Sequence, residues 1–448
     1  MFWRQSTARA ADVGIGNLHT GLGADPMQLM TVTGQLNGSP GSDRLLLDYG
    51  PTTAFGQTVR AELRTVDNTL TGKAPQYYLH GTLHGLEPGT SYRYRLRTSS
   101  GVVSPVGTVR TAPAGPGPFR FTAFGDEDVT TDSAAVLDLL RRQRPDFHLL
   151  AGDICYADST GAGLPVDSFD PTQWDRYFAR VTASAASTPW LFGTGNHDME
   201  AVYGNHGYGG FTQRIDVPGN GAPGCPTTFS FKYGNVAFLS VDFNDVSSEI
   251  PTNLGYSGGA QRTWLADRLR RYRAASSGVD FVVVLGHHAL YGTSSAHGSD
   301  GGVRAAFGPL FDQYRVDLVV NGHAHCYERT DPIRGGAATR GVAPGGTVRA
   351  RTDGTTYVTA GGGGASAVGF TGPVSDGTAA DNAPVTSFVN GAPGVHTPET
   401  VTWSRVRRTG HGLLVVDASP AAAGRGPRLT VRYLAADGSV GDRFVLGT

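Results

Sequence analysis

The feature that most constrains this chain is a series of short apolar runs, each ending in a polar residue. The runs are FRFTAFGD, DFHLLAGD, PWLFGTGNHD, VDFVVVLGHH and VDLVVNGHAH, and they lie between residues 119 and 325. The stretch DSAAVLDLLRRQRP between the first two has helical spacing of its apolar residues. We therefore predict a strand–helix–strand unit with parallel strands joined by a right-handed crossover, within an α/β domain.

Residues 20–112 show a different pattern, typical of an all-β sandwich. The runs MQLMTVTGQL, RLLLDYG, TVRAELRTV and SYRYRLRTSSG are separated by Gly, Pro and Asn turns. In the last run Tyr92, Tyr94 and Leu96 share one face and the arginines share the other, as in a strand with one solvated side. We predict an N-terminal extension at 1–19, an all-β domain at 20–112, a linker at 113–118 and an α/β domain at 119–448.

Two later segments complete the predicted organisation. Residues 365–400 are rich in Gly, Pro, Ser and Thr, so we predict a long surface loop there. The end of the chain, LLVVDAS followed by RLTVRYLAADGSVGDRFVL, predicts strands around an Asp-Gly hairpin turn.

Composition excludes several classes of partner. Lys and Arg total 37 against 38 Asp and Glu, which leaves no electrostatic footprint for nucleic acid or an anionic membrane. No apolar run reaches the ~18 residues of a membrane helix. The start MFWRQSTARAADVGIG shows no signal peptide, although a signal already removed stays open. Three cysteines make no disulfide framework, and we expect Cys155 and Cys326 to be buried, inert thiols.

The polar residues at the strand ends predict a metal centre. In an open α/β sheet, ligands bind at the carboxyl edge of the strands. Carboxylates, an amide, imidazoles and a phenol meet there: Asp126, Asp153, Tyr156, Asn196, His287, His323 and His325. Oxygen and nitrogen donors without a thiolate suit Zn, Mn or Fe. The set is too large for one ordinary site and fits two metals that share a bridging ligand.

Five blocks in one order also carry a resemblance to a known family. They are GD at 125, GDICY at 152, GNHD at 195, GHH at 286 and GHAH at 322. The set resembles the metallophosphoesterase (calcineurin-like phosphoesterase) superfamily, and its tyrosine variant, GDICYAD with GHAHCYER, is similar to purple acid phosphatases. The resemblance covers nearly the whole chain. It implies a four-layer α/β/β/α catalytic domain at 119–448, preceded by a fibronectin type III-like domain.

The resemblance also implies roles for the ligands. Asp126, Tyr156 and His325 would hold Fe(III), and a second set would hold a divalent Zn, Mn or Fe(II) ion: Asn196, His287 and His323. Asp153 would bridge the two ions. Phenolate is a hard, basic oxygen donor, so a tyrosine at this position stabilises the trivalent state and gives a purple charge-transfer colour.

The same resemblance implies acid phosphatase activity on phosphate monoesters of small molecules. A metal-bridging hydroxide would attack phosphorus in line with a leaving group assisted by histidine. His197 is the first candidate for that role, with Asp198 orienting its ring, and His297 is the second. The family's histidine pair carries over only in part, because Ala296 stands at its first position.

One departure from the family concerns the metal identity. Asp128 stands where the family has glycine and other metallophosphoesterases have a histidine ligand. Asp128 either adds a carboxylate beside the tyrosine-bearing metal or faces water, which leaves the ferric assignment open.

We interpret the other histidines as structural or peripheral. His288 points away from the site by alternation, and His206 lies in a loop. Four others are predicted to be structural or on the surface: His19, His80, His84 and His148. His396 and His411 are undecided, since either would be able to border the cleft.

Two alternatives to the phosphomonoesterase stay open. The first is a phosphodiesterase on the same scaffold, because the metal chemistry does not choose between esters. The second is a non-catalytic binding or adhesion protein, in which the β-domain is the functional part. Family resemblance alone favours a secreted or otherwise extracytoplasmic location.

Overall fold

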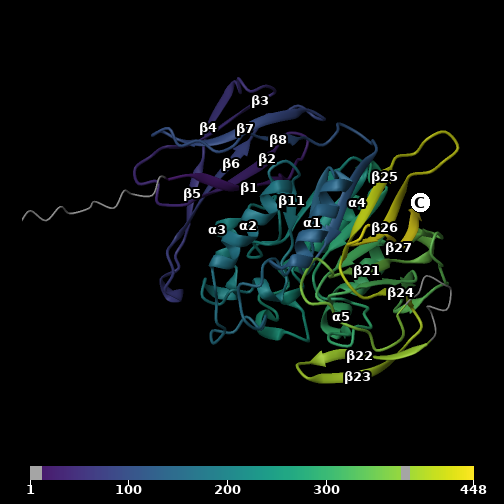
Figure 1. Cartoon of the computed structure of the whole chain (residues 1–448). Coiled ribbons are helices and arrows are strands. Elements are labelled where there is room, and N and C mark those ends of the chain that lie inside the picture. The colour runs from purple at the N-terminus through teal and green to yellow at the C-terminus, as the bar shows by residue number, and fades with distance from the viewer. Residues whose placement is uncertain (1–12, 375–383) are drawn as a thin grey trace, which may run out of the picture.

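The computed structural model describes residues 13–374 and 384–448. Figure 1 shows a small all-β domain at the N-terminal end, packed beside a larger domain in which helices flank two sheets. The larger domain holds the strand ends that were predicted to carry the metal ligands. Its architecture therefore decides whether those residues meet.

The N-terminal domain is a sandwich of two four-stranded antiparallel sheets. In sheet order the first contains β1 (Ile15–Leu22), β2 (Met30–Leu36), β6 (Gln76–Leu83) and β5 (Glu62–Val66). The second contains β4 (Gln57–Arg60), β3 (Leu45–Gly50), β7 (Ser91–Thr98) and β8 (Gly107–Arg110). In β7 the side chains of Tyr92, Tyr94 and Leu96 are buried, so the alternation predicted for this strand is present.

Two details of this domain differ from the sequence pattern. Strand β1 begins at Ile15, inside the segment predicted as an extension, because a register shift between Gly16 and His19 breaks the alternation that marks a strand. The run TVRAELRTV is two strands, β4 and β5, that belong to different sheets. Ala61 lies between them and is buried, with its N–H bonded to the Leu45 carbonyl, so the chain turns from one sheet to the other there.

The larger domain contains two seven-stranded sheets. In sheet order the first is β11 (Trp190–Phe192), β10 (Phe147–Leu150), β9 (Phe119–Phe124), β25 (Gly412–Ser419), β26 (Arg428–Ala435), β27 (Val440–Gly447) and β20 (Thr347–Arg349). The second is β12 (Phe229–Tyr233), β13 (Val236–Ser240), β14 (Phe281–Leu285), β16 (Leu318–Asn321), β21 (Thr356–Ala360), β17 (Tyr327–Thr330) and β24 (Ser404–Arg408). Strands β9, β10 and β11 are parallel, as are β13, β14, β16 and β21.

Aromatic side chains join the two sheets face to face. The rings of Phe121 and Phe238 meet edge to face with centroids 5.1 Å apart, and those of Phe147 and Phe231 meet at 5.6 Å. Helices cover the outer faces: α1 (Thr131–Gln143) and α2 (Thr172–Ala185) on the first sheet, α4 (Ala260–Arg273) and α5 (Gly301–Tyr314) on the second. The layers are therefore α/β/β/α, and the predicted fold class is confirmed.

The prediction of a long loop at residues 365–400 is wrong for the second half of that segment. Residues 385–401 form a hairpin of β22 (Val385–Ala392) and β23 (Val395–Val401), and β22 also pairs with β15 (Ser299–Asp300). The pattern was missed because β23 is largely exposed and has no buried face to show alternation. Residues 375–383 of the predicted loop lie outside the described residues.

The remaining short elements lie around these layers. They are α3 (Gly209–Arg214), α6 (Ala350–Asp353), β18 (Ile333–Arg334) and β19 (Ala337–Ala338). The hairpin predicted at the end of the chain is formed by β26 and β27, which pair antiparallel on either side of Asp437 and Gly438. The three cysteines are buried and unpaired, and burial raises the pKa of Cys155 and Cys326 well above the usual thiol value, as expected of inert thiols.

Polar contacts hold the sandwich against the larger domain. Asp216, just after α3, accepts hydrogen bonds from His80 at 2.9 Å and from Arg64 at 2.8 Å. Arg214 is buried, and its ion pair with Glu200 at 3.0 Å lies within the larger domain. Gln76 of β6 accepts from the same guanidinium at 2.9 Å.

Candidate metal centre

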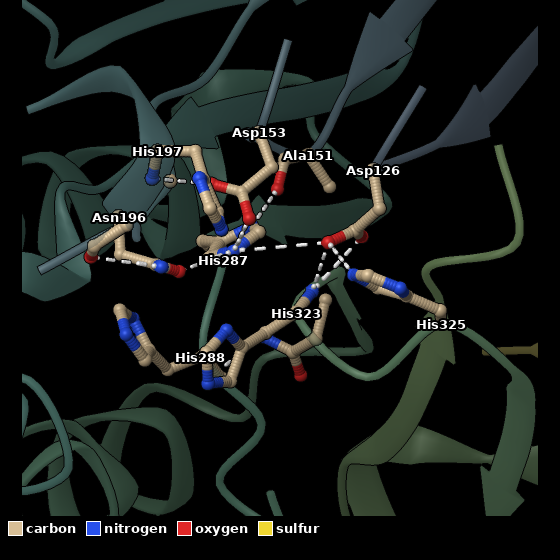
Figure 2. A network of polar contacts seen from close by, with 12 residues as sticks. Asp126, Ala151, Asp153, Asn196, His197, His287, His288, His323 and His325 are labelled. Carbon is tan, nitrogen blue, oxygen red and sulfur yellow. Dashed lines mark hydrogen bonds and ion pairs between the residues drawn. The ribbon is translucent and has the colours of Figure 1, made fainter. Parts of the chain in front are cut away.

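The predicted ligands meet where the carboxyl ends of the two sheets lie side by side. Asp126 follows β9, Asp153 and Tyr156 follow β10, and Asn196 follows β11 of the first sheet. The histidines follow strands of the second sheet: His287 after β14, His323 and His325 after β16. Figure 2 shows the side chains of Asp126, Asp153, Asn196, His287, His323 and His325 converging on one region.

One group of donors is centred on the phenol. The Tyr156 hydroxyl lies 2.9 Å from Nε2 of His325 and 3.3 Å from Oδ1 of Asp126. The distance between His325 Nε2 and Asp126 Oδ1 is 3.4 Å. Nδ1 of His325 donates to the Ser366 carbonyl at 2.7 Å, which leaves Nε2 with its lone pair turned toward the other two donors.

A second group is centred on His287. Its Nε2 lies 3.1 Å from Oδ2 of Asp153 and 3.1 Å from Oδ1 of Asn196. Its Nδ1 donates to the Ala151 carbonyl at 2.7 Å, so Nε2 is the ring nitrogen that faces Asp153 and Asn196. One ring nitrogen of His323 lies within 4.8 Å of the donors of Asp153 and His287. Asp153 and Asp126 are both within 4 Å of His287 Nε2, so the two groups are contiguous.

The backbone is strained at these residues. Asp126, Asp153, Tyr156 and His323 have φ angles of 61°, 53°, 53° and 68°, a left-handed region that side chains rarely adopt. Asp128 shares this feature with φ of 59°. Such conformations cost on the order of 1–3 kcal/mol each and concentrate at functional sites, where they aim a side chain that regular structure would point elsewhere.

The electrostatics of the site fit bound cations. Asp126 and Asp153 are fully buried, and burial together with these carboxylates raises the pKa of Tyr156 well above its usual value. Burial lowers the pKa of His287, but the same two carboxylates outweigh it and raise that pKa to about 10. A phenol here therefore ionises only when positive charge offsets its neighbours. Hard oxygen donors, imidazole nitrogens and buried negative charge suit two metal ions of the Fe, Zn or Mn type.

His197 lies beside the ligands, and its orienting partner differs from the predicted one. Its Nδ1 donates to Oδ1 of Asp158 at 2.6 Å. Asp198, predicted for that role, instead accepts from the backbone N–H groups of Gly195, Asp153 and Ile154 at 2.8, 2.9 and 3.1 Å. The side chain of Asp198 is thereby turned to the loop after β10, which it holds in place.

His297 is also near the site and has a partner that the sequence did not suggest. Its ring lies 3.9 Å from that of His323, centroid to centroid. Glu249 accepts from Nδ1 of His297 at 2.8 Å and from Nε2 of His323 at 3.1 Å. The sequence analysis did not identify Asp158, although it stands in the GDICYAD block, because nothing in the sequence shows that it pairs with His197. Glu249 stands in VSSEIP, where no motif marks it.

The positions of the remaining histidines vary. His288 is fully buried and its ring packs on that of His323 at 4.4 Å, so it supports the site rather than facing away from it. The ring of His206 lies tilted against that of Tyr256, with centroids 4.7 Å apart. Of the four histidines predicted to be structural or on the surface, three are buried: His19, His80 and His148. The fourth, His84, is exposed.

The two undecided histidines and Asp128 have local partners. His411 lies near the site loops, with Nε2 2.9 Å from the Ala365 carbonyl, whereas His396 stacks on Phe388 within the β22–β23 hairpin. Asp128 accepts from the N–H of Val129 at 2.5 Å. The contact engages one of the two carboxylate oxygens of Asp128.

An α/β/β/α sandwich with metal-type donors at the joined strand ends defines the class as a metallophosphoesterase. Residues 120–327 match the family described as calcineurin-like phosphoesterase. A Mycobacterium tuberculosis protein, Rv2577, is 33% identical over 474 residues, covering 96% of this chain and 86% of that protein. The chain belongs to the calcineurin-like phosphoesterase family.

Purple acid phosphatases are among its relatives. Purple acid phosphatase 23 of Arabidopsis thaliana is 26% identical over 57% of this chain and 58% of its own length. The solved structure of purple acid phosphatase PPD1 from yellow lupin (Lupinus luteus) superposes with a TM-score of 0.74 at 21% identity. The superposition covers 97% of this chain and 74% of the lupin chain, which shows a common fold. No helix among the described residues is long and apolar enough to cross a membrane.

Proposed function

We propose that the protein is a dinuclear-metal hydrolase of phosphate monoesters. The observation that carries the proposal is the meeting of four oxygen-bearing and three imidazole side chains at adjoining strand ends: Asp126, Asp153, Tyr156, Asn196, His287, His323 and His325. Phosphatase activity accords with the family and with the purple acid phosphatase relatives.

The two groups of donors suggest which residues hold which ion. Asp126, Tyr156 and His325 would hold Fe(III), since a phenolate is the donor that favours a trivalent ion. Asn196, His287 and His323 would hold a divalent Zn, Mn or Fe(II) ion, with Asp153 shared between the two. When bound, two such ions supply a hydroxide near neutral pH and positive charge against the phosphoryl oxygens.

The protein's own groups would bind the ester and move the proton. Burial lowers the pKa of His197, but Asp153 and Asp158 together raise it to about 9. A protonated imidazole would bind a phosphoryl oxygen and donate its proton to the leaving oxygen. His297 would stand on the other side as a second donor. Asp198 would act through the loop that it holds.

The monoester preference has one further support. A phosphoenolpyruvate phosphatase of Allium cepa is 28% identical over 60% of this chain and 54% of its own length. Phosphoenolpyruvate is a small phosphate monoester. We therefore propose small phosphorylated molecules as the substrate class. We also propose that the protein works outside the cytoplasm.

An absorption spectrum with metal analysis on the same sample tests the metal assignment. We expect iron plus one divalent ion per chain and a broad visible band that disappears in Tyr156→Phe. A colourless protein with two equivalents of zinc or manganese would contradict the tyrosinate–ferric centre and direct attention to Asp128.

Substrate class is tested separately with a matched pair of esters. We expect a larger kcat/KM for an aryl phosphate monoester than for the diester of the same phenol. The reverse order would identify a phosphodiesterase, and no turnover of either by the metal-loaded protein would contradict the enzyme.

A further inference from the structure

Glu249 joins two histidines that have different proposed roles. One carboxylate oxygen lies 2.8 Å from Nδ1 of His297, and the other lies 3.1 Å from Nε2 of His323. The carboxylate is 19% exposed, and the side chain of His323 is 4% exposed, so the contacts lie at the inner wall of the site. Both ring nitrogens donate, because a carboxylate paired with two imidazoles accepts.

These contacts fix the tautomer of each ring. With Nε2 of His323 protonated and bonded to Glu249, the lone pair is on Nδ1, the nitrogen left to bind a metal. With Nδ1 of His297 bonded to the same carboxylate, Nε2 is left to meet a ligand. Acceptors behind a metal-ligating histidine orient the ring and raise its basicity, and their loss costs roughly 10–100-fold in metal affinity or activity.

Glu249 is itself held from two directions. Asp300, at the start of α5, accepts from the backbone N–H of Glu249 at 3.2 Å and from that of Ser248 at 3.0 Å. Asn390 of β22 donates to Glu249 Oε2 at 2.9 Å and also to the backbone carbonyl of His297. Because β22 pairs with β15 at Asp300 and Asn390, both supports belong to one local structure.

We propose that Glu249 is a positioning residue, which orients the proposed metal ligand His323 and the substrate-facing His297 together, with Asn390 tying the β22–β23 hairpin to the centre. The inference rests on the proposed function, because it assigns a role to ligands of that site. Glu249 lies outside all five sequence blocks and would nevertheless be part of the site. The inference also gives the hairpin a function on the His297 side of the cleft.

The test compares Glu249→Gln with a matched control. Gln keeps the shape but removes the charge and one of the two acceptors. Glu399→Gln removes a carboxylate from β23 that is 22% exposed, similar to Glu249, and that pairs with Arg304 instead. Divalent affinity is measured by titrating Co²⁺ into the protein and following its visible spectrum. Turnover of an aryl phosphate then separates kcat from KM.

We expect Glu249→Gln to weaken binding of one Co²⁺ equivalent by roughly 10–100-fold. Its Co²⁺ spectrum should change, and kcat should fall more than KM rises. Glu399→Gln should leave the affinity and the spectrum as in the wild type. Asn390→Ala should show a weaker form of the Glu249→Gln effect, because the carboxylate remains but loses one support.

Two results would overturn the inference. A folded Glu249→Gln protein with unchanged Co²⁺ affinity and spectrum would show that the carboxylate does not orient His323. Loss of a third metal equivalent would show instead that Glu249, His297 and His323 bind a cation themselves, since their donors lie within 4.8 Å of one another. Failure of the proposed function looks different, because the wild type would then bind fewer than two ions and turn over neither ester.

Discussion

The two seven-stranded sheets contribute different chemistry to one site. The first sheet supplies the oxygen donors, from the turns after β9, β10 and β11. The second supplies the nitrogen donors, from the turns after β14 and β16. Neither sheet holds a full set for either proposed ion. The full set of donors therefore comes together only when the two sheets are packed.

Most donors of the two sheets are aimed by different means, while His323 combines both, with a φ of 68° and its Nε2 bonded to Glu249. Asp126, Asp153 and Tyr156 are directed by strained left-handed turns. His287 and His325 are directed by backbone carbonyls that accept from the ring nitrogen facing away from the site. A carboxylate has no N–H group that a backbone carbonyl could hold, so its direction is set by the backbone. An imidazole has two ring nitrogens, and the nitrogen that does not bind the metal can be held by an acceptor that orients the ring.

The largest expected effect comes from removing one donor of each sheet. Asp153→Ala and His323→Ala should each lower turnover of an aryl phosphate by more than the roughly 100-fold typical of outer partners. Metal content, measured on the same samples, should fall below two equivalents. His84→Ala, which changes an exposed histidine of the sandwich, is the control. Near-normal turnover in either variant would contradict the proposal that both sheets supply metal ligands.

A smaller effect is expected from Asp158→Asn. Asp158 is buried and pairs with His197, which follows a strand of the oxygen-donating sheet but is not one of the proposed ligands. We expect kcat to fall by roughly 10–100-fold while the metal content stays unchanged, because the ring loses its orientation and not the ions. Loss of metal in this variant would mean that Asp158 supports the ligands instead.

The smallest effect on the site is expected from Asp216→Asn, which lies away from both strand edges. Burial raises the pKa of Asp216, but His80 and Arg64 outweigh it and hold that pKa well below its usual range. Breaking such a buried pair should cost about 3 kcal/mol of unfolding free energy at neutral pH. Metal content and kcat of the folded protein should match the wild type.

The pH dependence of that variant provides an internal check. A depressed carboxyl pKa stabilises the fold above the unfolded pKa of about 3.9, and the stabilisation is lost as the pH falls further. The difference in unfolding free energy between wild type and Asp216→Asn should therefore shrink below about pH 4. A difference independent of pH would show that the charge of Asp216 is not what holds the sandwich.

The apolar runs of the larger domain and the polar residues that end them were readable from the sequence alone. Apolar runs ending in Asp, Asn or His predict parallel strands with a shared ligand edge, because strand direction fixes where each run ends. The same rule placed Asp126, Asp153, Asn196, His287 and His323 correctly at strand ends. Alternation likewise predicted the buried face of β7. These features are local, so they can be read from neighbouring residues.

The groups that support the donors become visible only in the folded structure. Asp158 contacts His197 across 39 residues, and Glu249 contacts His297 across 48 residues and His323 across 74. Asn390 contacts Glu249 across 141 residues. Polar groups in loops carry no periodicity, so nothing local marks them. The β22–β23 hairpin was hidden for a related reason. Its two strands are paired by backbone hydrogen bonds and not marked by a pattern of buried side chains. Every residue has a backbone carbonyl, and every residue except proline has a backbone N–H, so such pairing leaves no signal in the sequence.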